Sequence, residues 1–443
     1  MGESQIKLTV NNFRAIESAE IELDGITVVS GENGCGKSTL SKLLYYAFKS
    51  AIEYDKLVYW ELFASLDKIA SKLDGALLDL YANLDTKIRM LLPIRPQQLN
   101  SIEDCYSTEE FIVTYIDYLK IIYPHLVSDQ AKAYINSIQY FIVSLLDDKG
   151  DKIEELQKKS WKDLLDELVA KVHSDIDIAK NKVQKRELKL FDSILIRVFN
   201  DRAIGQKFNL YERGANIINR EIDRLMNVRA VEKVLYIDTP MAVGLSNPEL
   251  PYWKNLDKTL KMLDYSSAKE TSIEKILSDE ILNGHVSYEE GVLDRFTYKR
   301  ADGLEINLLE CATGAKSFAA IQLLLKNGFF NDKTLMMIDE PEAHLHPQWI
   351  VEFARMIVLL NKELGVKFFI ASHSPDMISA IKYISEKEGV TPNLNFYLAE
   401  KKNSTDYTYS YRALGTNIDD IYASFNIAFD KIDLYGTVDD EVL

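Results

Sequence analysis

The stretch VVSGENGCGKSTLSKLL, residues 28–44, decides the fold because it fits the phosphate-binding pattern G-x-x-x-x-G-K-[ST]. Residues 6–30, which precede it, alternate apolar and polar side chains in short runs and indicate two or three strands. Residues 37–52 carry apolar side chains at helical spacing. A strand, a glycine loop and a helix in this order predict a phosphate site at the N-terminal end of the helix.

The residue types in the loop suit a nucleotide. Glycines remove side chains where backbone N–H groups turn toward phosphate oxygens. The Lys37 ammonium is placed to reach the outer phosphates, and the Ser38 hydroxyl to complete the coordination of Mg²⁺. The expected ATP-binding residues are Gly31, Asn33, Gly34, Gly36, Lys37, Ser38 and Thr39.

Two later motifs each end a buried apolar strand. TLMMIDEPEAHLHP, residues 334–347, ends its strand in Asp339 and Glu340. We expect Asp339 to contact Mg²⁺ through water and Glu340 to be the general base for the attacking water. FFIASHSP, residues 368–375, ends its strand at His373. A structural histidine is the alternative, but the position one strand after the acidic pair favours a sensor of the γ-phosphate.

These three motifs, in this order, resemble those of the ATP-binding cassette (ABC) superfamily. ECATGAKS, residues 310–317, resembles its signature motif, with Thr313, Gly314 and Lys316 where the family has its Ser-Gly-Gly-Gln/Glu core. Ala315 and Lys316 depart from that pattern. The resemblance implies a head-to-tail dimer, in which the signature residues of one chain contact the ATP bound by the other.

Residues 10–40, 338–360 and 371–381 resemble one branch of that superfamily, the SMC, RecF and OLD-like ATPases. Within it, residues 338–360 and 371–381 resemble the stand-alone prokaryotic OLD-like ATPases, a group common in anti-phage systems such as Septu and PARIS. The resemblance implies that Arg14 approaches the nucleotide, and that Glu342, His344 and His346 form the D-loop facing the second subunit. An exposed strand-end arginine, and a metal site formed by these histidines with Glu342 and His373, are the alternatives.

The rest of the chain divides by composition. Residues 51–227 have few glycines and long helical patterns, which predict a helical insertion, either a short hairpin or a compact bundle rather than a long coiled coil. Residues 1–50 and 228–443 would then form a composite α/β head, with a mixed-sheet lobe and a parallel-sheet core. The strand end at Asp238 and Thr239 could occupy the place of the Q-loop.

Composition and charge bound the partners. The 443 residues have a formal net charge of -16, which argues against binding nucleic acid over the whole surface. Three widely spaced cysteines and no apolar run long enough to span a membrane indicate a cytoplasmic protein. The densest basic run, KNKVQKRELK at residues 180–189, is either a solvated helix face or a DNA contact.

The expected function is an ATP-driven switch. ATP binding closes a homodimer or higher oligomer, and hydrolysis reopens it to control a separate effector, a nuclease or a toxin. The alternatives are a DNA-repair head that binds DNA directly, and a nuclease with its own site in the helical middle. Paired acids at Asp419 and Asp420, or at Asp439 and Asp440, are more typical of a solvated face than of metal ligands.

Overall fold

The computed structural model describes residues 6–81, 102–122, 129–146, 153–245, 248–262, 272–291, 295–403 and 405–423. The chain forms two compact units. The head unit consists of residues 1–52 and 188–443, and the helical unit of residues 53–187. Among the described residues, no helix combines the length and the apolar character needed to cross a membrane.

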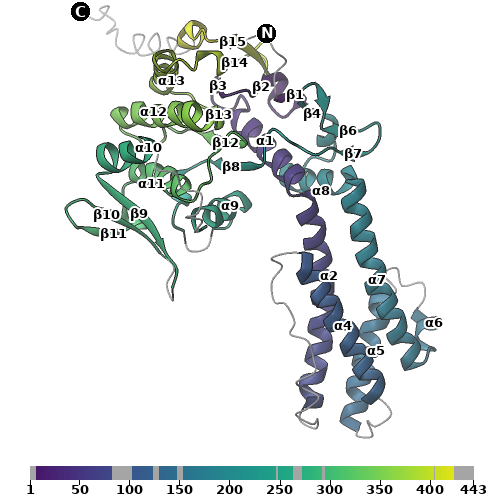
Figure 1. Cartoon of the computed structure of the whole chain (residues 1–443). Helices are drawn as coiled ribbons and strands as arrows, with labels where there is room; N and C mark the ends of the chain where they lie inside the picture. The colour runs from purple at the N-terminus through teal and green to yellow at the C-terminus, as the bar shows by residue number, and fades with distance from the viewer. Residues whose placement is uncertain are drawn as a thin grey trace, which may run out of the picture. The chain divides into compact units, whose positions relative to one another are not determined.

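The head unit is built on one ten-stranded sheet with the strand order β5-β4-β1-β2-β15-β14-β3-β13-β12-β8 (Figure 1). Neighbouring strands from β14 to β8 are parallel, whereas those from β5 to β2 are antiparallel. The strands are β1 (Ile6–Phe13), β2 (Ile16–Glu22), β3 (Ile26–Ser30), β4 (Phe208–Glu212), β5 (Ala215–Asn216), β8 (Lys233–Ile237), β12 (Thr334–Asp339), β13 (Lys367–Ala371), β14 (Leu394–Glu400) and β15 (Tyr409–Gly415).

The parallel part of the sheet is covered on both faces. Every residue of β3, β12 and β13 is buried, which explains why these strands are continuously apolar rather than alternating. Helix α1 (Lys37–Ile52) packs against β8, β12 and β13, while α12 (Pro347–Leu364) packs on α13 (Pro375–Glu388). The predicted fold class, an α/β head with a mixed-sheet lobe and a parallel-sheet core, is confirmed.

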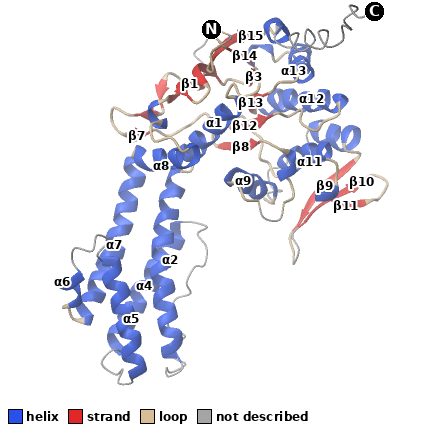
Figure 2. Cartoon of the chain, turned by 180° about the vertical axis from the view of Figure 1, so that it is seen from behind, coloured by secondary structure: helices blue, strands red, loops and turns tan. Residues whose placement is uncertain are grey.

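The remaining elements of the head lie around this sheet (Figure 2). A second sheet has the order β11-β10-β9 and is antiparallel. A short antiparallel ribbon pairs β6 with β7. The strands and helices of the head outside the ten-stranded sheet include α8 (Leu188–Phe199), β6 (Ile218–Asn219), β7 (Arg224–Leu225), α9 (Pro251–Leu260), α10 (Ser272–Lys275), β9 (Gly284–Glu289), β10 (Arg295–Arg300), β11 (Glu305–Asn307) and α11 (Thr313–Lys326).

The helical unit contains α2 (Tyr54–Tyr81), α4 (Ile102–Ile122), α5 (Asp129–Leu146), α6 (Ile153–Gln157) and α7 (Trp161–Lys185). Helix α2 packs against α4, α5 and α7. The apolar stripe of α7 is buried as its spacing predicts, and the Ser160 side chain caps its first turn. The described helices therefore bury their apolar faces against one another.

The second boundary of this unit differs from the sequence prediction. The composition places the end of the insertion at residue 227, whereas the helical unit ends at Glu187. Residues 208–212 form β4, which pairs along β1 and extends the head sheet. Because the partner strand lies far from β4 in the sequence, local composition alone does not reveal this pairing.

Candidate active site

The strand registers bring the three motifs to one edge of the sheet. Val29 of β3 pairs with Ala371 of β13, which pairs with Asp339 of β12. Backbone hydrogen bonds continue past the strand ends: Ser372 N–H donates to Val29 O at 3.1 Å and Glu340 N–H to Ala371 O at 2.8 Å. The glycine loop, the acidic pair and the histidine loop therefore follow neighbouring carboxyl ends.

The glycine loop needs its glycines for conformation and for space. Gly31, Gly34 and Gly36 have φ angles of +152°, +83° and +102°, a region that other residues rarely adopt. A Cβ on Gly31 would lie 2.7 Å from Ala399 Cβ, and one on Gly36 would lie 2.7 Å from Ile16 Cγ1. The loop thus passes close to β2 and β14 while its backbone turns.

Lys37 is the first residue of α1, and its side chain reaches back to the loop. Its Nζ donates to the carbonyl oxygens of Gly31 at 2.8 Å and Glu32 at 3.1 Å. The side chain is buried, whereas Asn33 and Ser38 are exposed, as is Gly34, and Thr39 is half-buried. The ammonium group thereby closes the loop through two hydrogen bonds. When a nucleotide binds, phosphate oxygens would have to replace these carbonyls as its partners.

Asp339 is buried and held by hydroxyl groups. Its carboxylate accepts hydrogen bonds from Ser41 and from Tyr236, the latter at 2.7 Å, and Ser38 also donates to it. Burial raises the pKa of Asp339, and the three hydroxyls act in the opposite direction. The Ser38 hydroxyl and the Asp339 carboxylate are hard oxygen donors, so these residues fit Mg²⁺.

Glu340 and His373 meet at the same edge. His373 Nδ1 lies 3.5 Å from Glu340 Oε1, and both side chains are half-exposed. Glu340 has a φ of +48°, an uncommon conformation for a residue other than glycine. Strained backbone of this kind is often found at functional sites, where the surrounding structure compensates its cost.

Glu342 is one of the three residues expected to form the D-loop, and that role stays a prediction. Its side chain is buried within its own chain, where Oε1 accepts from Ser372 Oγ at 2.9 Å and from His373 N–H at 3.0 Å. His344 and His346 are exposed, and the His346 side chain caps α12. These two histidines remain available at the surface, whereas Glu342 is bonded inside the subunit.

The signature residues fall into two groups. Thr313 begins α11 and is half-buried, with Oγ1 3.7 Å from Met241 Sδ. Gly314 lies under Trp349, whose ring would be 2.6 Å from a Cβ. Lys316 is buried and its Nζ donates to Leu309 O at 2.8 Å, and a contact with ATP across the dimer stays a prediction. Its ammonium already has a partner within its own chain.

Arg14 is tied to the end of α8. Its guanidinium donates to Phe199 O at 3.0 Å and lies over the rings of Phe13 and Phe199. Its φ of +54° places it in the turn between β1 and β2. The observed contacts match the alternative of a strand-end arginine, and an approach to nucleotide stays a prediction.

Asp238 follows β8, the neighbour of β12. It accepts hydrogen bonds from Tyr252 Oη and Trp253 Nε1, both at 2.7 Å. Because β8 and β12 are parallel, Asp238 and Thr239 come to the same edge as the acidic pair. This is the place expected for a Q-loop, but the Asp238 carboxylate is engaged by two aromatic donors.

Two tyrosines near the end of the described chain support the glycine loop, and no sequence motif predicts them. Tyr411 Oη donates to Cys35 O at 3.1 Å, and Tyr409 Oη to Glu32 Oε2 at 3.0 Å. Both lie on β15, more than 370 positions away in sequence. No local pattern marks them, because their role depends on where β15 enters the sheet.

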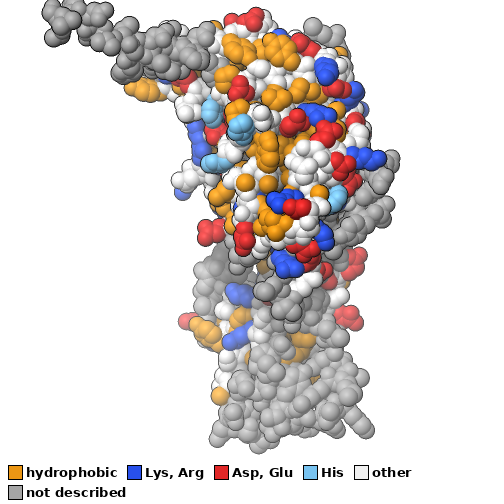
Figure 3. All heavy atoms as spheres, turned by 90° about the vertical axis from the view of Figure 1, so that its left-hand side faces the viewer, with side chains coloured by type: hydrophobic (Ala, Val, Ile, Leu, Met, Phe, Trp, Pro, Cys, Tyr) orange, Lys and Arg blue, Asp and Glu red, His pale blue; other side chains and the backbone are white. Residues whose placement is uncertain are grey.

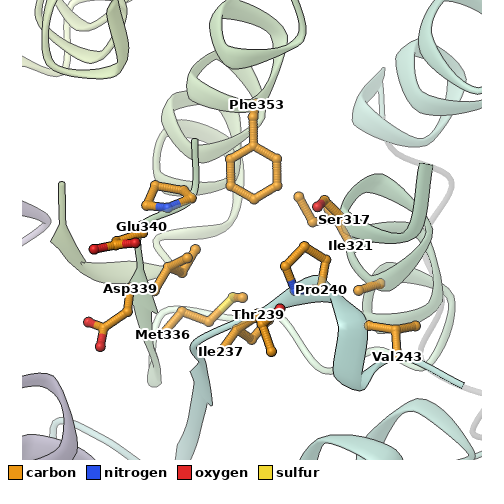
Figure 4. Close-up of a pocket in the computed structure, with 13 residues that line it drawn as sticks. Ile237, Thr239, Pro240, Val243, Ser317, Ile321, Met336, Asp339, Glu340 and Phe353 are labelled. Carbon is orange, nitrogen blue, oxygen red and sulfur yellow. The ribbon is translucent and has the colours of Figure 1, made fainter. Parts of the chain in front are cut away.

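A small apolar cavity borders the site (Figure 4). The cavity has a volume of about 20 Å³, which is room for roughly one water. The labelled Asp339 and Glu340 carboxylates point away from its centre, toward which Phe353, Ile321 and Met336 turn. The cavity therefore lies behind the acidic strand end rather than in front of it.

The basic run at residues 180–189 is largely paired with acids. Lys182 lies 3.8 Å from Glu61, and Arg186 is buried with its guanidinium 2.8 Å from Asp55. Lys180 and Lys185 also contact carboxylates. Among the described residues, no three His, Cys, Asp or Glu side chains form a group that could hold a metal; Asp439 and Asp440 lie outside them.

Comparison with known proteins identifies the family. The AAA ATPase domain family (AAA_15) matches residues 6–378, and no curated protein matches. Among solved structures, the SMC head domain with an extended coiled coil from Pyrococcus furiosus is 12% identical, covering 97% of this chain and 99% of that one, with a TM-score of 0.32. The SMC head domain from Thermotoga maritima is 9% identical, covering 94% and 99%, with a TM-score of 0.34. The match over residues 6–378 shows that the chain belongs to the AAA ATPase domain family and is an ATP-hydrolysing enzyme.

Proposed function

We propose that the chain hydrolyses ATP at the sheet edge formed by the ends of β3, β12 and β13. The observation that carries the proposal is the convergence there of four groups of matching chemistry: Lys37, Asp339, Glu340 and His373. The strand pairing Val29–Ala371–Asp339 supports it, because it brings residues from three distant motifs to one edge.

In this mechanism each residue acts from its observed position. The Lys37 ammonium exchanges the carbonyls of Gly31 and Glu32 for oxygens of the outer phosphates. Ser38 and Asp339 would hold Mg²⁺, which when bound neutralises phosphate charge. Glu340, being half-exposed, takes the proton of the attacking water, and His373 donates toward the γ-phosphate.

We also propose that a second copy closes the site. Helix α11 begins after Ala312, whose methyl group accepts no hydrogen bond, so its first N–H groups suit an anion. Met241 and Leu309, which flank this helix start, are exposed apolar residues. Figure 3 shows apolar side chains gathered on the side of the head that carries α10 to α12. These features support a head-to-tail dimer with ATP between the copies.

The dimer is proposed to switch a separate effector, a nuclease or toxin, in anti-phage defence. The resemblance of residues 338–360 and 371–381 to stand-alone OLD-like ATPases supports this, and the net charge of -16 suits a basic protein partner. Direct DNA binding has less support, because most cations of residues 180–189 contact carboxylates.

Two variants test the proposal. Lys37→Ala should abolish binding of a fluorescent ATP analogue, and Glu340→Gln should bind ATP, stop turnover and accumulate as a nucleotide-loaded dimer in light scattering. Unchanged turnover in either variant would contradict the role of that residue. Duplex DNA titrated onto the wild-type chain at several salt concentrations provides the second arm: ATP-stimulated binding would favour the DNA-repair alternative.

A further inference from the structure

The loop that carries His373 is bonded to a single buried carboxylate. Glu342 Oε1 accepts from the Ser372 hydroxyl at 2.9 Å and from the His373 backbone N–H at 3.0 Å. Ser372 Oγ in turn accepts from Ser374 N–H at 3.1 Å. Three consecutive residues after β13 are thus fixed, directly or through one hydroxyl, by one side chain that follows β12.

The same carboxylate lies next to the His373 ring. His373 Nδ1 is 3.6 Å from Glu342 Oε1 and 3.5 Å from Glu340 Oε1, so the ring stands between two acids. The two acids differ in exposure: the Glu340 side chain is 46% exposed and that of Glu342 is 7% exposed. Glu340 therefore faces solvent, whereas Glu342 faces the protein.

The environment of Glu342 is costly to maintain. Its Oε2 is buried and has no hydrogen-bond partner among the described residues. Leaving a buried polar atom unsatisfied costs about 1–3 kcal/mol, and more for a charged group. A buried carboxylate with one unpaired oxygen beside Glu340 and His373 is more typical of a functional site than of a packing position.

We propose that Glu342 is a positioning residue for ATP hydrolysis, which fixes the loop of residues 372–374 and thereby holds the His373 ring beside Glu340. It acts through His373 and does not itself touch the nucleotide. The inference rests on the proposed function, since it assigns a role to a residue supporting the same site.

The test compares two substitutions with a matched control. Glu342→Ala removes both hydrogen bonds, whereas Glu342→Gln keeps an oxygen that accepts them. Asn361→Ala is the control, because Asn361 is equally buried and donates its side-chain amide to Val366 O at 2.9 Å, at the opposite end of β13. Thermal unfolding of all three variants is measured first, so that kinetic effects are compared at known stability.

We expect Glu342→Ala to lower kcat about 10- to 100-fold, because small misplacements of catalytic groups cost this much, while KM for ATP changes little. Glu342→Gln should retain most of the wild-type kcat, and Asn361→Ala should lose stability but not kcat. Combined with His373→Ala, the Glu342→Ala substitution should cause no further loss, since both act through one group.

Three results would overturn the inference: a kcat for Glu342→Ala equal to that of Asn361→Ala, equal losses for the Ala and Gln variants, or losses that multiply with His373→Ala. Turnover by the wild-type chain is measured alongside. It distinguishes a failure of the Glu342 inference from a failure of the proposed function. ATPase activity that survives the Lys37→Ala substitution would refute the proposed function itself, whatever the Glu342 variants do.

Discussion

Substitution of Tyr236 by Phe tests how Asp339 is held. Tyr236 is fully buried and donates to Asp339 at 2.7 Å, while its ring packs on Tyr45 and Tyr252. Phenylalanine keeps that packing and removes one hydrogen bond to a carboxylate, worth about 1.5–3 kcal/mol. For a unit of this size we expect the unfolding temperature to fall by about 3–6 °C.

Tyr252→Phe is the matched control. Tyr252 belongs to the same aromatic cluster and also donates to a carboxylate at 2.7 Å, but its partner is Asp238. Both variants should therefore lose comparable stability in thermal unfolding without nucleotide. Only Tyr236→Phe releases the carboxylate that we propose holds Mg²⁺.

The assay is the binding of a fluorescent ATP analogue with Mg²⁺ and with EDTA. In Mg²⁺ the Kd of Tyr236→Phe should rise about tenfold, equivalent to about 1.4 kcal/mol, and in EDTA it should match the wild type. A similar rise for Tyr252→Phe, or a rise that persists in EDTA, would refute the reasoning, because neither can arise from a displaced Asp339.

Three further outcomes follow. Gly36→Ala places a Cβ 2.7 Å from Ile16 at a φ of +102°, so calorimetry should show lower stability, by about 1–3 kcal/mol, and titration weaker ATP binding. Gly314→Ala drives a Cβ to 2.6 Å from the Trp349 ring, so tryptophan fluorescence should change and light scattering should detect less ATP-dependent dimer. Burial raises the pKa of Cys105 to about 11 from 9.0, so between these values the folded state retains a proton that the unfolded state loses. The free energy of unfolding should therefore fall as pH rises from 9 to 11. Denaturant titrations at several pH values should show a flatter slope for Cys105→Ala.

The sequence predicts the features that depend on residues close together in the chain. The loop at residues 31–37, the helix from Lys37 and the apolar strands ending at Asp339 and Ala371 all follow from spacing and residue type. Their convergence also follows, because the carboxyl ends of parallel strands meet at one edge of a sheet. The α/β fold of the head could therefore be predicted from the sequence alone.

Features that depend on distant partners could not be predicted. Glu342 lies within a motif that indicates a surface loop, yet the direction of its side chain depends on Ser372 and His373. Tyr411 and β4 carry no local signal, since their partners, Cys35 and β1, lie far from them in the sequence.

The place of β15 in the sheet has a consequence for the order of folding. This strand lies between β2 and β14, so it joins the antiparallel half of the ten-stranded sheet to the parallel half. During synthesis both halves can be complete except for this strand, with the edges of β2 and β14 open to wrong partners. Closure of the sheet must wait until residues 409–415 leave the ribosome, and only then does Tyr411 reach the glycine loop. The chain therefore acquires its finished phosphate loop only after β15 has been synthesised, which delays nucleotide binding until the head sheet is whole.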